Sequence, residues 1–182
     1  MRTVFLMIAR VLYDKGYAEY VEAARIIRKE YPESEFLLLG SIDKEYPNYV
    51  PAEMVRHDHA EGTIRYLGFQ PNVRSYIKEA DCIVHPTFYN EGMSRVLMEA
   101  MALRRPIITT NIPGCRETVD NGQNGFIVPP KDTDALVTAI RRFLLLTPEE
   151  KHQMGEYGRR KAEQEFDVHR VIEVYRRITQ AK

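Results

Sequence analysis

Short, continuous apolar segments that alternate with helix-like segments constrain this sequence more than any other feature. Such runs extend from Thr3 to Ala9, from Glu35 to Leu39 and from Cys82 to His85. A strand that is apolar on both faces must be covered on both faces, which is typical of a parallel sheet between two layers of helices. The chain is therefore predicted to be an α/β protein with a doubly wound parallel sheet.

The rest of the sequence continues this alternation. A helix is predicted from Tyr17 to a boundary at Pro32, whereas residues 43–61, with Pro47 and Pro51, read as polar and irregular. Further strands are predicted at 63–67, 106–109 and 125–128, and further helices at 72–80, 132–146, 148–166 and 168–178. The length and the 44% apolar content suit one domain over residues 1–182.

Composition and charge bound the function without excluding a local basic patch. Lys plus Arg equals Asp plus Glu at 26 each, so no overall field favours nucleic acid or an anionic membrane. Cys82 and Cys115 are too few for a disulfide framework, and the expected setting is a reducing cytoplasm. The apolar runs are too short to span a bilayer, and the first one lacks the cleavage site of a signal peptide.

The stretch NEGMSRVLMEAMA, from Asn90 to Ala102, follows the third apolar run and carries two carboxylates. On a helical wheel its apolar stripe contains Val96, Leu97, Ala100 and Met101. Glu99 falls on the border of that stripe, so its side chain is expected to be partly buried. A salt bridge to Arg95, one turn earlier, is the structural alternative.

The start of this helix is suited to an anion. Gly92 lets a ligand approach the backbone, Ser94 can cap the helix, and the first N–H groups carry the positive end of the helix dipole. Glu91 either stabilises the helix dipole or binds a hydroxyl beside a phosphate. Glu99 could accept from a second pair of hydroxyls. A diphosphate with hydroxyls at both ends is a nucleotide sugar.

At these residues the sequence resembles the retaining glycosyltransferases of the GT4 family, which have the GT-B fold. The E-x7-E motif of that family is matched by Glu91 and Glu99, and its basic pair by Arg10 and Lys15 in ARVLYDKG. Its later signature is matched by RRPIITTNIPGCRETVDNGQNGFIVPPKDTDAL. The three matches occur in the family's order and cover nearly the whole chain.

The resemblance implies a role for each group of residues. Arg10 and Lys15, which would otherwise be read as solvated charges, neutralise the leaving diphosphate, and Glu91 contacts a hydroxyl of the donor sugar. Glu99 binds the ribose hydroxyls. The remaining implied donor contacts are three backbone groups at the helix start and a loop beside the base: Gly92, Met93 and Ser94, then Tyr66, Leu67, Gly68 and Phe69.

The resemblance also implies what the chain does. It is expected to be the Rossmann-like donor-binding domain of an enzyme that transfers a hexosyl group from a UDP- or GDP-sugar to a glycan, lipid or small acceptor, without a metal or other cofactor. The resemblance implies that the N-terminal acceptor domain of such an enzyme is absent from this chain. The full-length protein is expected in the cytoplasm, with peripheral association at the inner face of the membrane, in cell-surface polysaccharide biosynthesis. Two alternatives are a stand-alone nucleotide- or partner-binding module and half of a sugar-nucleotide 2-epimerase.

The sequence departs from the family pattern at two places, and two further motifs resemble metal sites. EGMS stands where the family commonly has EGFG, which leaves the donor sugar open, and Arg104 stands where the family often has glycine, so a local backbone adjustment is expected. Asp132-Thr133-Asp134 resembles a metal-binding DxD motif, but Asp132 is expected to cap a helix. The sequence 57–59, His-Asp-His, is expected in a solvated loop and not at a metal.

Overall fold

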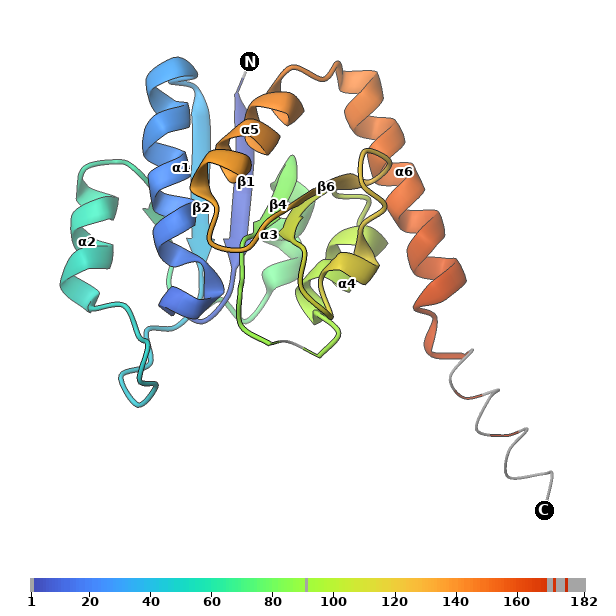
Figure 1. Cartoon of the computed structure of the whole chain (residues 1–182), viewed down its shortest axis with the longest axis horizontal. Helices are drawn as coiled ribbons and strands as arrows, with labels where there is room; N and C mark the ends of the chain where they lie inside the picture. The colour runs from blue at the N-terminus through green and yellow to red at the C-terminus, as the bar shows by residue number, and fades with distance from the viewer. Residues whose placement is uncertain (1, 91, 170–171, 173–175, 177–182) are drawn as a thin grey trace.

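Six parallel strands form one sheet between two layers of helices (Figure 1). The computed structural model describes residues 2–90, 92–169, 172 and 176. The strand order is β3-β2-β1-β4-β5-β6, and every pairing of neighbours is parallel. The strands are β1 (Thr3–Ile8), β2 (Ser34–Leu39), β3 (Arg65–Tyr66), β4 (Cys82–His85), β5 (Ile107–Thr110) and β6 (Gly125–Val128). The predicted doubly wound sheet is confirmed.

The helices cover both faces of this sheet. They are α1 (Tyr17–Glu30), α2 (Ala52–Ala60), α3 (Val73–Glu79), α4 (Arg95–Ala102), α5 (Thr133–Leu144) and α6 (Pro148–Glu165). Phe5 packs in the cluster that contains the buried side chains of α1 and α5, whereas its neighbour Leu6 packs in the cluster that contains those of α3 and α4. Successive strand residues therefore bury opposite faces, as the continuous apolar runs require. None of the helices in the described part of the chain is long and apolar enough to cross a membrane.

One helix was not expected from the sequence. Helix α2 lies within region 43–61, which reads as irregular in the sequence. Pro51 does not prevent this helix, because it stands at the N-cap, where a missing N–H costs nothing. The 57–59 motif lies on this helix and not in a solvated loop. Asp58 is buried there and accepts a hydrogen bond of 2.6 Å from the hydroxyl of Tyr17.

Other boundaries differ less from those predicted. Helix α4 begins at Arg95 and not at Gly92. The helix predicted at 168–178 lies largely outside the described residues.

Arg104, which stands where the family often has glycine, adopts a backbone conformation that favours glycine. Its φ is 58°, in the left-handed region, directly after the Leu103 C-cap of α4. A Cβ atom at Gly155 of α6 would lie only 2.4 Å from the Arg104 carbonyl oxygen, so α6 packs against this turn. The side chain of Arg104 also pairs with Glu156, with 2.5 Å between Nε and Oε1.

We expect Arg104→Gly to raise the free energy of unfolding by up to about 1 kcal/mol, measured by urea denaturation. A non-glycine residue in the left-handed region costs about 1–2 kcal/mol, part of which the greater freedom of glycine in the unfolded chain offsets. Arg104→Val should lower it by about 1–2 kcal/mol, since a β-branched residue fits this region poorly. Glu156→Gln removes the half-exposed ion pair alone and should cost less than about 1 kcal/mol. Wild-type stability of Arg104→Val would contradict this account.

Candidate functional site

The loops that follow β1, β2 and β4 lie together along the lower edge of the sheet in Figure 1. β1 and β4 are neighbours in the sheet, and from them the chain winds outward in opposite directions to β3 and to β6. In doubly wound sheets, ligands bind at such a switch point, beyond the carboxyl ends of the strands. This edge is therefore the candidate site.

The loop after β1 is packed directly on the loop after β4. Gly16 has a φ of 85°, and a Cβ atom there would lie 2.3 Å from the carbonyl oxygen of Pro86. In the same two loops, the carbonyl oxygen of Asp14 accepts hydrogen bonds from the backbone N–H groups of Phe88 (2.9 Å) and Tyr89 (3.0 Å). Two segments far apart in the sequence are thus fixed against each other by backbone contacts.

This packing brings both predicted cations to the same edge. Arg10 lies two residues after the end of β1 and is partly buried, and its guanidinium carbon lies 3.8 Å from the ring centroid of Tyr46. Lys15 belongs to a short 3₁₀ helix, η1 (Tyr13–Lys15), and is only 7% exposed. Its ammonium nitrogen lies 4.3 Å from the ring centroid of Tyr89. Neither tyrosine was among the predicted site residues.

The segment before α4 provides the backbone of the site. Gly92 and Met93 are exposed, and a Cβ atom at Gly92 would meet nothing within 4 Å. Ser94 is buried at the N-cap, where its side chain makes no capping hydrogen bond, so this part of the prediction was wrong. Its backbone N–H donates to the carbonyl oxygen of Gly114 (3.0 Å) and therefore already has an acceptor. Glu91 lies outside the described residues.

Gly114 is itself held in place. Its φ is 84°, and its N–H donates to Oε2 of Glu117 at 2.7 Å. Burial alone raises the pKa of Glu117, but hydrogen bonds from backbone N–H groups of Glu117 and Gly114 and from Arg116 outweigh it, so the pKa is lowered. The charged carboxylate thus fixes the turn whose carbonyl group holds the start of α4.

Glu99 lies in the second turn of α4 and is partly buried, as the helical wheel predicts. Within the described residues, no ion pair joins it to Arg95, so the structural alternative is not seen. Glu99 lines a hollow of about 380 Å³ between α4 and α6, together with Met98 of α4 and Phe166 after α6. Its side chain therefore faces this hollow and is not sealed in the core.

The predicted base-binding loop follows β3, at the outer edge of the sheet and two strands from β1. The N–H of Gly40 donates to the carbonyl oxygen of Gly68 (2.9 Å), and the hydroxyl of Tyr66 donates to that of Gly40 (2.8 Å). Burial raises the pKa of Tyr66, so it remains a neutral donor. Leu67 packs against the core, whereas Phe69 is 74% exposed.

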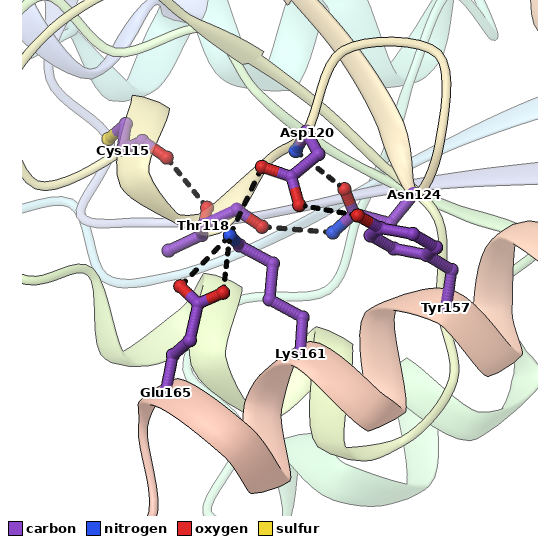
Figure 2. A network of polar contacts seen from close by, with 7 residues as sticks. All are labelled: Cys115, Thr118, Asp120, Asn124, Tyr157, Lys161 and Glu165. Atoms are coloured by element: carbon purple, nitrogen blue, oxygen red, sulfur yellow. Dashed lines mark hydrogen bonds and ion pairs between the residues drawn. The ribbon is translucent and has the colours of Figure 1, made fainter.

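A polar network joins α6 to the segment that precedes β6 (Figure 2). Lys161, which is 8% exposed, places its ammonium nitrogen 3.1 Å from Oδ1 of Asp120 and 3.0 Å from Oε2 of Glu165. The hydroxyl of Tyr157 donates to the other oxygen of Asp120 (2.9 Å). Burial alone lowers the pKa of Lys161, but its hydrogen bonds to Glu165 and Asp120 outweigh burial and raise it.

The same network continues toward the site. The backbone N–H of Asp120 donates to the side chain of buried Asn124 (2.8 Å), and the Asn124 amide donates to the carbonyl oxygen of Thr118 (2.9 Å). The Thr118 hydroxyl donates to the carbonyl oxygen of Cys115 (2.6 Å), the neighbour of Gly114. Helix α6 is thereby connected, through side chains and backbone, to the turn that holds the start of α4.

A larger hollow, of about 880 Å³, lies at the opposite edge, next to the first residues of the strands. Several basic side chains line it, but the carboxyl ends of the helices also point there and supply negative charge. Arg105, for example, donates from Nη1 to the carbonyl oxygen of Ala80 at 3.1 Å. Two others pair with carboxylates, Arg2 with Glu35 and Arg104 with Glu156. These cations already have partners, so this hollow is not the candidate site.

The residues that sequence motifs offered to a metal have other contacts. Asp132 is the N-cap of α5, as predicted, and accepts a hydrogen bond of 2.8 Å from the backbone N–H of Ala135. Across 2–90 and 92–169, no group of three His, Cys, Asp or Glu side chains is placed to hold a metal ion.

The strand order and the position of the site define a Rossmann-like domain with its ligand edge at the β1–β4 switch point. A family model described as "Glycosyl transferases group 1" matches residues 1–161. The chain belongs to this family of glycosyltransferases, as the resemblance predicted at the level of the group 1 family, and the predicted fold class is confirmed.

Two curated relatives illustrate the similarity. The capsular polysaccharide biosynthesis glycosyltransferase CapM of Staphylococcus aureus is 30% identical over 168 residues, which cover 87% of this chain and 41% of CapM. An N,N'-diacetylbacillosaminyl-diphospho-undecaprenol alpha-1,3-N-acetylgalactosaminyltransferase of Campylobacter jejuni is 29% identical over 154 residues, 85% of this chain and 39% of that protein. The chain thus spans less than half the length of these relatives.

Solved structures share the fold at lower identity. HepE of Anabaena, determined in complex with UDP, has a TM-score of 0.87 and 20% identity, and the match covers all of this chain and 49% of HepE. The C-terminal domain of a group 1 glycosyltransferase, LpcC of Francisella tularensis, has a TM-score of 0.78 and 18% identity over 91% of this chain and 87% of that domain.

We expect Gly16→Ala to lower the free energy of unfolding by about 2–4 kcal/mol. The left-handed backbone costs a non-glycine residue about 1–2 kcal/mol, and the contact with Pro86 forces a backbone shift that costs about 1–3 kcal/mol more. Gly122→Ala is the matched control, because Gly122 has a similar φ of 83° with nothing within 4 Å of a Cβ atom. Equal losses in the two variants, by urea denaturation, would show that the Gly16–Pro86 contact is not tight.

We expect Lys161→Met to lower the free energy of unfolding at pH 7 by about 1–3 kcal/mol, because Asp120 and Glu165 lose a charged donor. The pKa of Lys161 is raised above its ordinary value of 10.5, so its contribution is complete below pH 10.5 and is lost as the pH rises through the folded-state pKa. Urea denaturation should therefore show a smaller difference in the free energy of unfolding between Lys161→Met and wild type above pH 10.5 than at pH 7. Lys29→Met, at an exposed lysine of α1, should differ little from wild type at either pH.

Proposed function

We propose that this chain is the donor nucleotide-sugar-binding domain of a retaining glycosyltransferase, which transfers a hexosyl group from a UDP- or GDP-sugar to a glycan, lipid or small acceptor. The observation that carries the proposal is that Arg10, Lys15 and the segment before α4 lie at the same edge of the sheet, at the switch point. Two cations beside a helix start suit a diphosphate. Membership of the family supports the transfer reaction, and HepE, solved with UDP and with UDP-glucose, supports a UDP-sugar as the first donor to test.

The proposed chemistry lies mainly in charge stabilisation. Arg10 and Lys15 stabilise the charge that develops on the nucleoside diphosphate as the glycosidic bond breaks. The backbone at Gly92 and Met93 holds phosphate or sugar, and Glu91 contacts a sugar hydroxyl. We propose that no metal is required, because the two cations supply the positive charge at the diphosphate.

The nucleoside occupies the side of the site toward β3 and α4 in this proposal. Glu99 accepts hydrogen bonds from the ribose hydroxyls, and the loop over 66–69 borders the base. Glu99 is suited to this role because it lines a hollow and because, in the described part of the chain, no ion pair joins it to a Lys or Arg side chain.

The acceptor is proposed to bind to a second, N-terminal domain, since the relatives are more than twice as long as the part that matches this chain. The donor then lies in a cleft between two domains, where positioning of the reactants and exclusion of water lower the barrier. We place the whole protein in the cytoplasm, associated peripherally with the inner face of the membrane, in cell-surface polysaccharide biosynthesis. The relative named for capsular polysaccharide supports this placement.

We expect the wild-type chain to bind UDP or GDP in a calorimetric titration, and to bind the corresponding 2′-deoxynucleotide at least about tenfold more weakly. A hydrogen bond to a charged group contributes about 1.5–3 kcal/mol, and 1.4 kcal/mol is tenfold in affinity. Glu99→Gln should lose most of this discrimination while keeping wild-type stability.

The control for this experiment is Glu163→Gln, across the same hollow on α6, which should discriminate like wild type. Binding of neither nucleotide by the wild type would overturn the proposed function. Discrimination that survives in Glu99→Gln would overturn only the role of Glu99.

A further inference from the structure

Tyr46 has no role in the site described so far, yet its ring lies over one of the two cations. The guanidinium carbon of Arg10 is 3.8 Å from the ring centroid, well inside the range of about 6 Å for a cation–π interaction. Tyr46 is 39% exposed, so this pair lies at the surface of the site and not in the core.

The segment that carries Tyr46, residues 42–50, is tied to the loop after β1. The N–H of Tyr13 donates to the carbonyl oxygen of Asn48 (2.9 Å), and the N–H of Val50 donates to that of Val11 (3.1 Å). The side-chain amide of Asn48 donates to Oδ2 of Asp14 (2.8 Å). Asp14 is also the residue whose carbonyl oxygen holds the loop after β4. The position of Tyr46 is therefore coupled to the backbone of the site.

The ring and the guanidinium have complementary geometry. An arginine loses considerable rotamer freedom when it is ordered by a ligand, whereas a tyrosine has few rotamers to lose. A ring in contact with the guanidinium restricts that motion, and because it accepts no hydrogen bond from the N–H groups as a carboxylate would, these can still bind phosphate oxygens. Within 2–90 and 92–169, no carboxylate pairs with Arg10, so its charge stays available to a ligand.

We propose that Tyr46 is a positioning residue of the donor site, whose ring orders Arg10 before the diphosphate of the nucleotide sugar binds. This inference rests on the proposed function. Tyr89 contacts Lys15 in a comparable way, but Lys15 is already buried, so removal of the Tyr46 ring has the larger effect on preorganisation.

Two substitutions at Tyr46 distinguish the effect of the aromatic ring from the effect of apolar side-chain volume. Tyr46→Phe keeps the aromatic face, whereas Tyr46→Leu keeps an apolar side chain without one. The titrant is UDP, or GDP if that is the nucleotide that the wild type binds. Calorimetry should show wild-type affinity in Tyr46→Phe and about two- to fivefold weaker affinity in Tyr46→Leu. Affinity for the nucleoside alone should not change. Tyr49→Leu, in the same segment, is the matched control and should bind the diphosphate like wild type.

Two further measurements connect the effect to Arg10. In an Arg10→Gln background, Tyr46→Leu should cause no additional loss of affinity. Without ligand, the Nε–H resonance of Arg10 should show a ring-current shift in wild type and in Tyr46→Phe, and the shift should be absent in Tyr46→Leu.

Several outcomes would overturn the role of Tyr46. These are wild-type affinity in Tyr46→Leu, an equal loss in Tyr46→Phe, and a loss that persists without Arg10. Tighter binding by Tyr46→Leu would mean that the ring competes with the diphosphate, which also overturns it. A wild-type chain that binds neither UDP nor GDP would overturn the proposed function and this inference together, whereas binding without a ring effect would overturn this inference alone.

Discussion

The contact between Gly16 and the carbonyl group of Pro86 is the constraint on which the candidate site depends. A Cβ atom at Gly16 would lie 2.3 Å from that oxygen, so glycine is required by both the left-handed backbone and the lack of space. The hydrogen bonds that the Asp14 carbonyl accepts from Phe88 and Tyr89 lock the same two loops. Because Arg10 and Lys15 lie on one loop and the start of α4 lies beyond the other, backbone packing determines where the two cations lie relative to that helix start.

The start of α4 depends on a second, longer chain of contacts. Its N-cap residue, Ser94, is held through its backbone N–H by Gly114 and not by its own side chain. The turn at Gly114 is fixed by Glu117 on one side and, through Cys115, by the network that ends at Lys161 on the other. Interactions on α6, far along the sequence, therefore contribute to the position of the helix start proposed to bind the donor.

The parts of the fold that the sequence predicted are those with a local physical cause. The strands were predictable because burial on both faces requires continuous apolar runs, and the Asp132 cap because a side chain bonds the N–H three residues on. Helix α2 was missed because prolines and polar residues read as loop, although Pro51 stands just before its first turn. Tyr46 could not have been predicted, since its contact joins two loops whose meeting depends on the whole sheet.

The two edges of the sheet show why cations alone do not define an anion site. At the edge where the strands begin, Arg104 pairs with Glu156, Arg2 pairs with Glu35, and Arg105 donates to a carbonyl oxygen at a helix end. Those charges are already compensated. At the edge where the strands end, the helix start supplies positive potential, and Arg10 is held by an aromatic ring. A ring restrains a guanidinium without cancelling its charge. A carboxylate also restrains it, but cancels the charge. With a tyrosine and not a carboxylate as its neighbour, Arg10 therefore keeps its charge for the diphosphate that is proposed to bind at this edge.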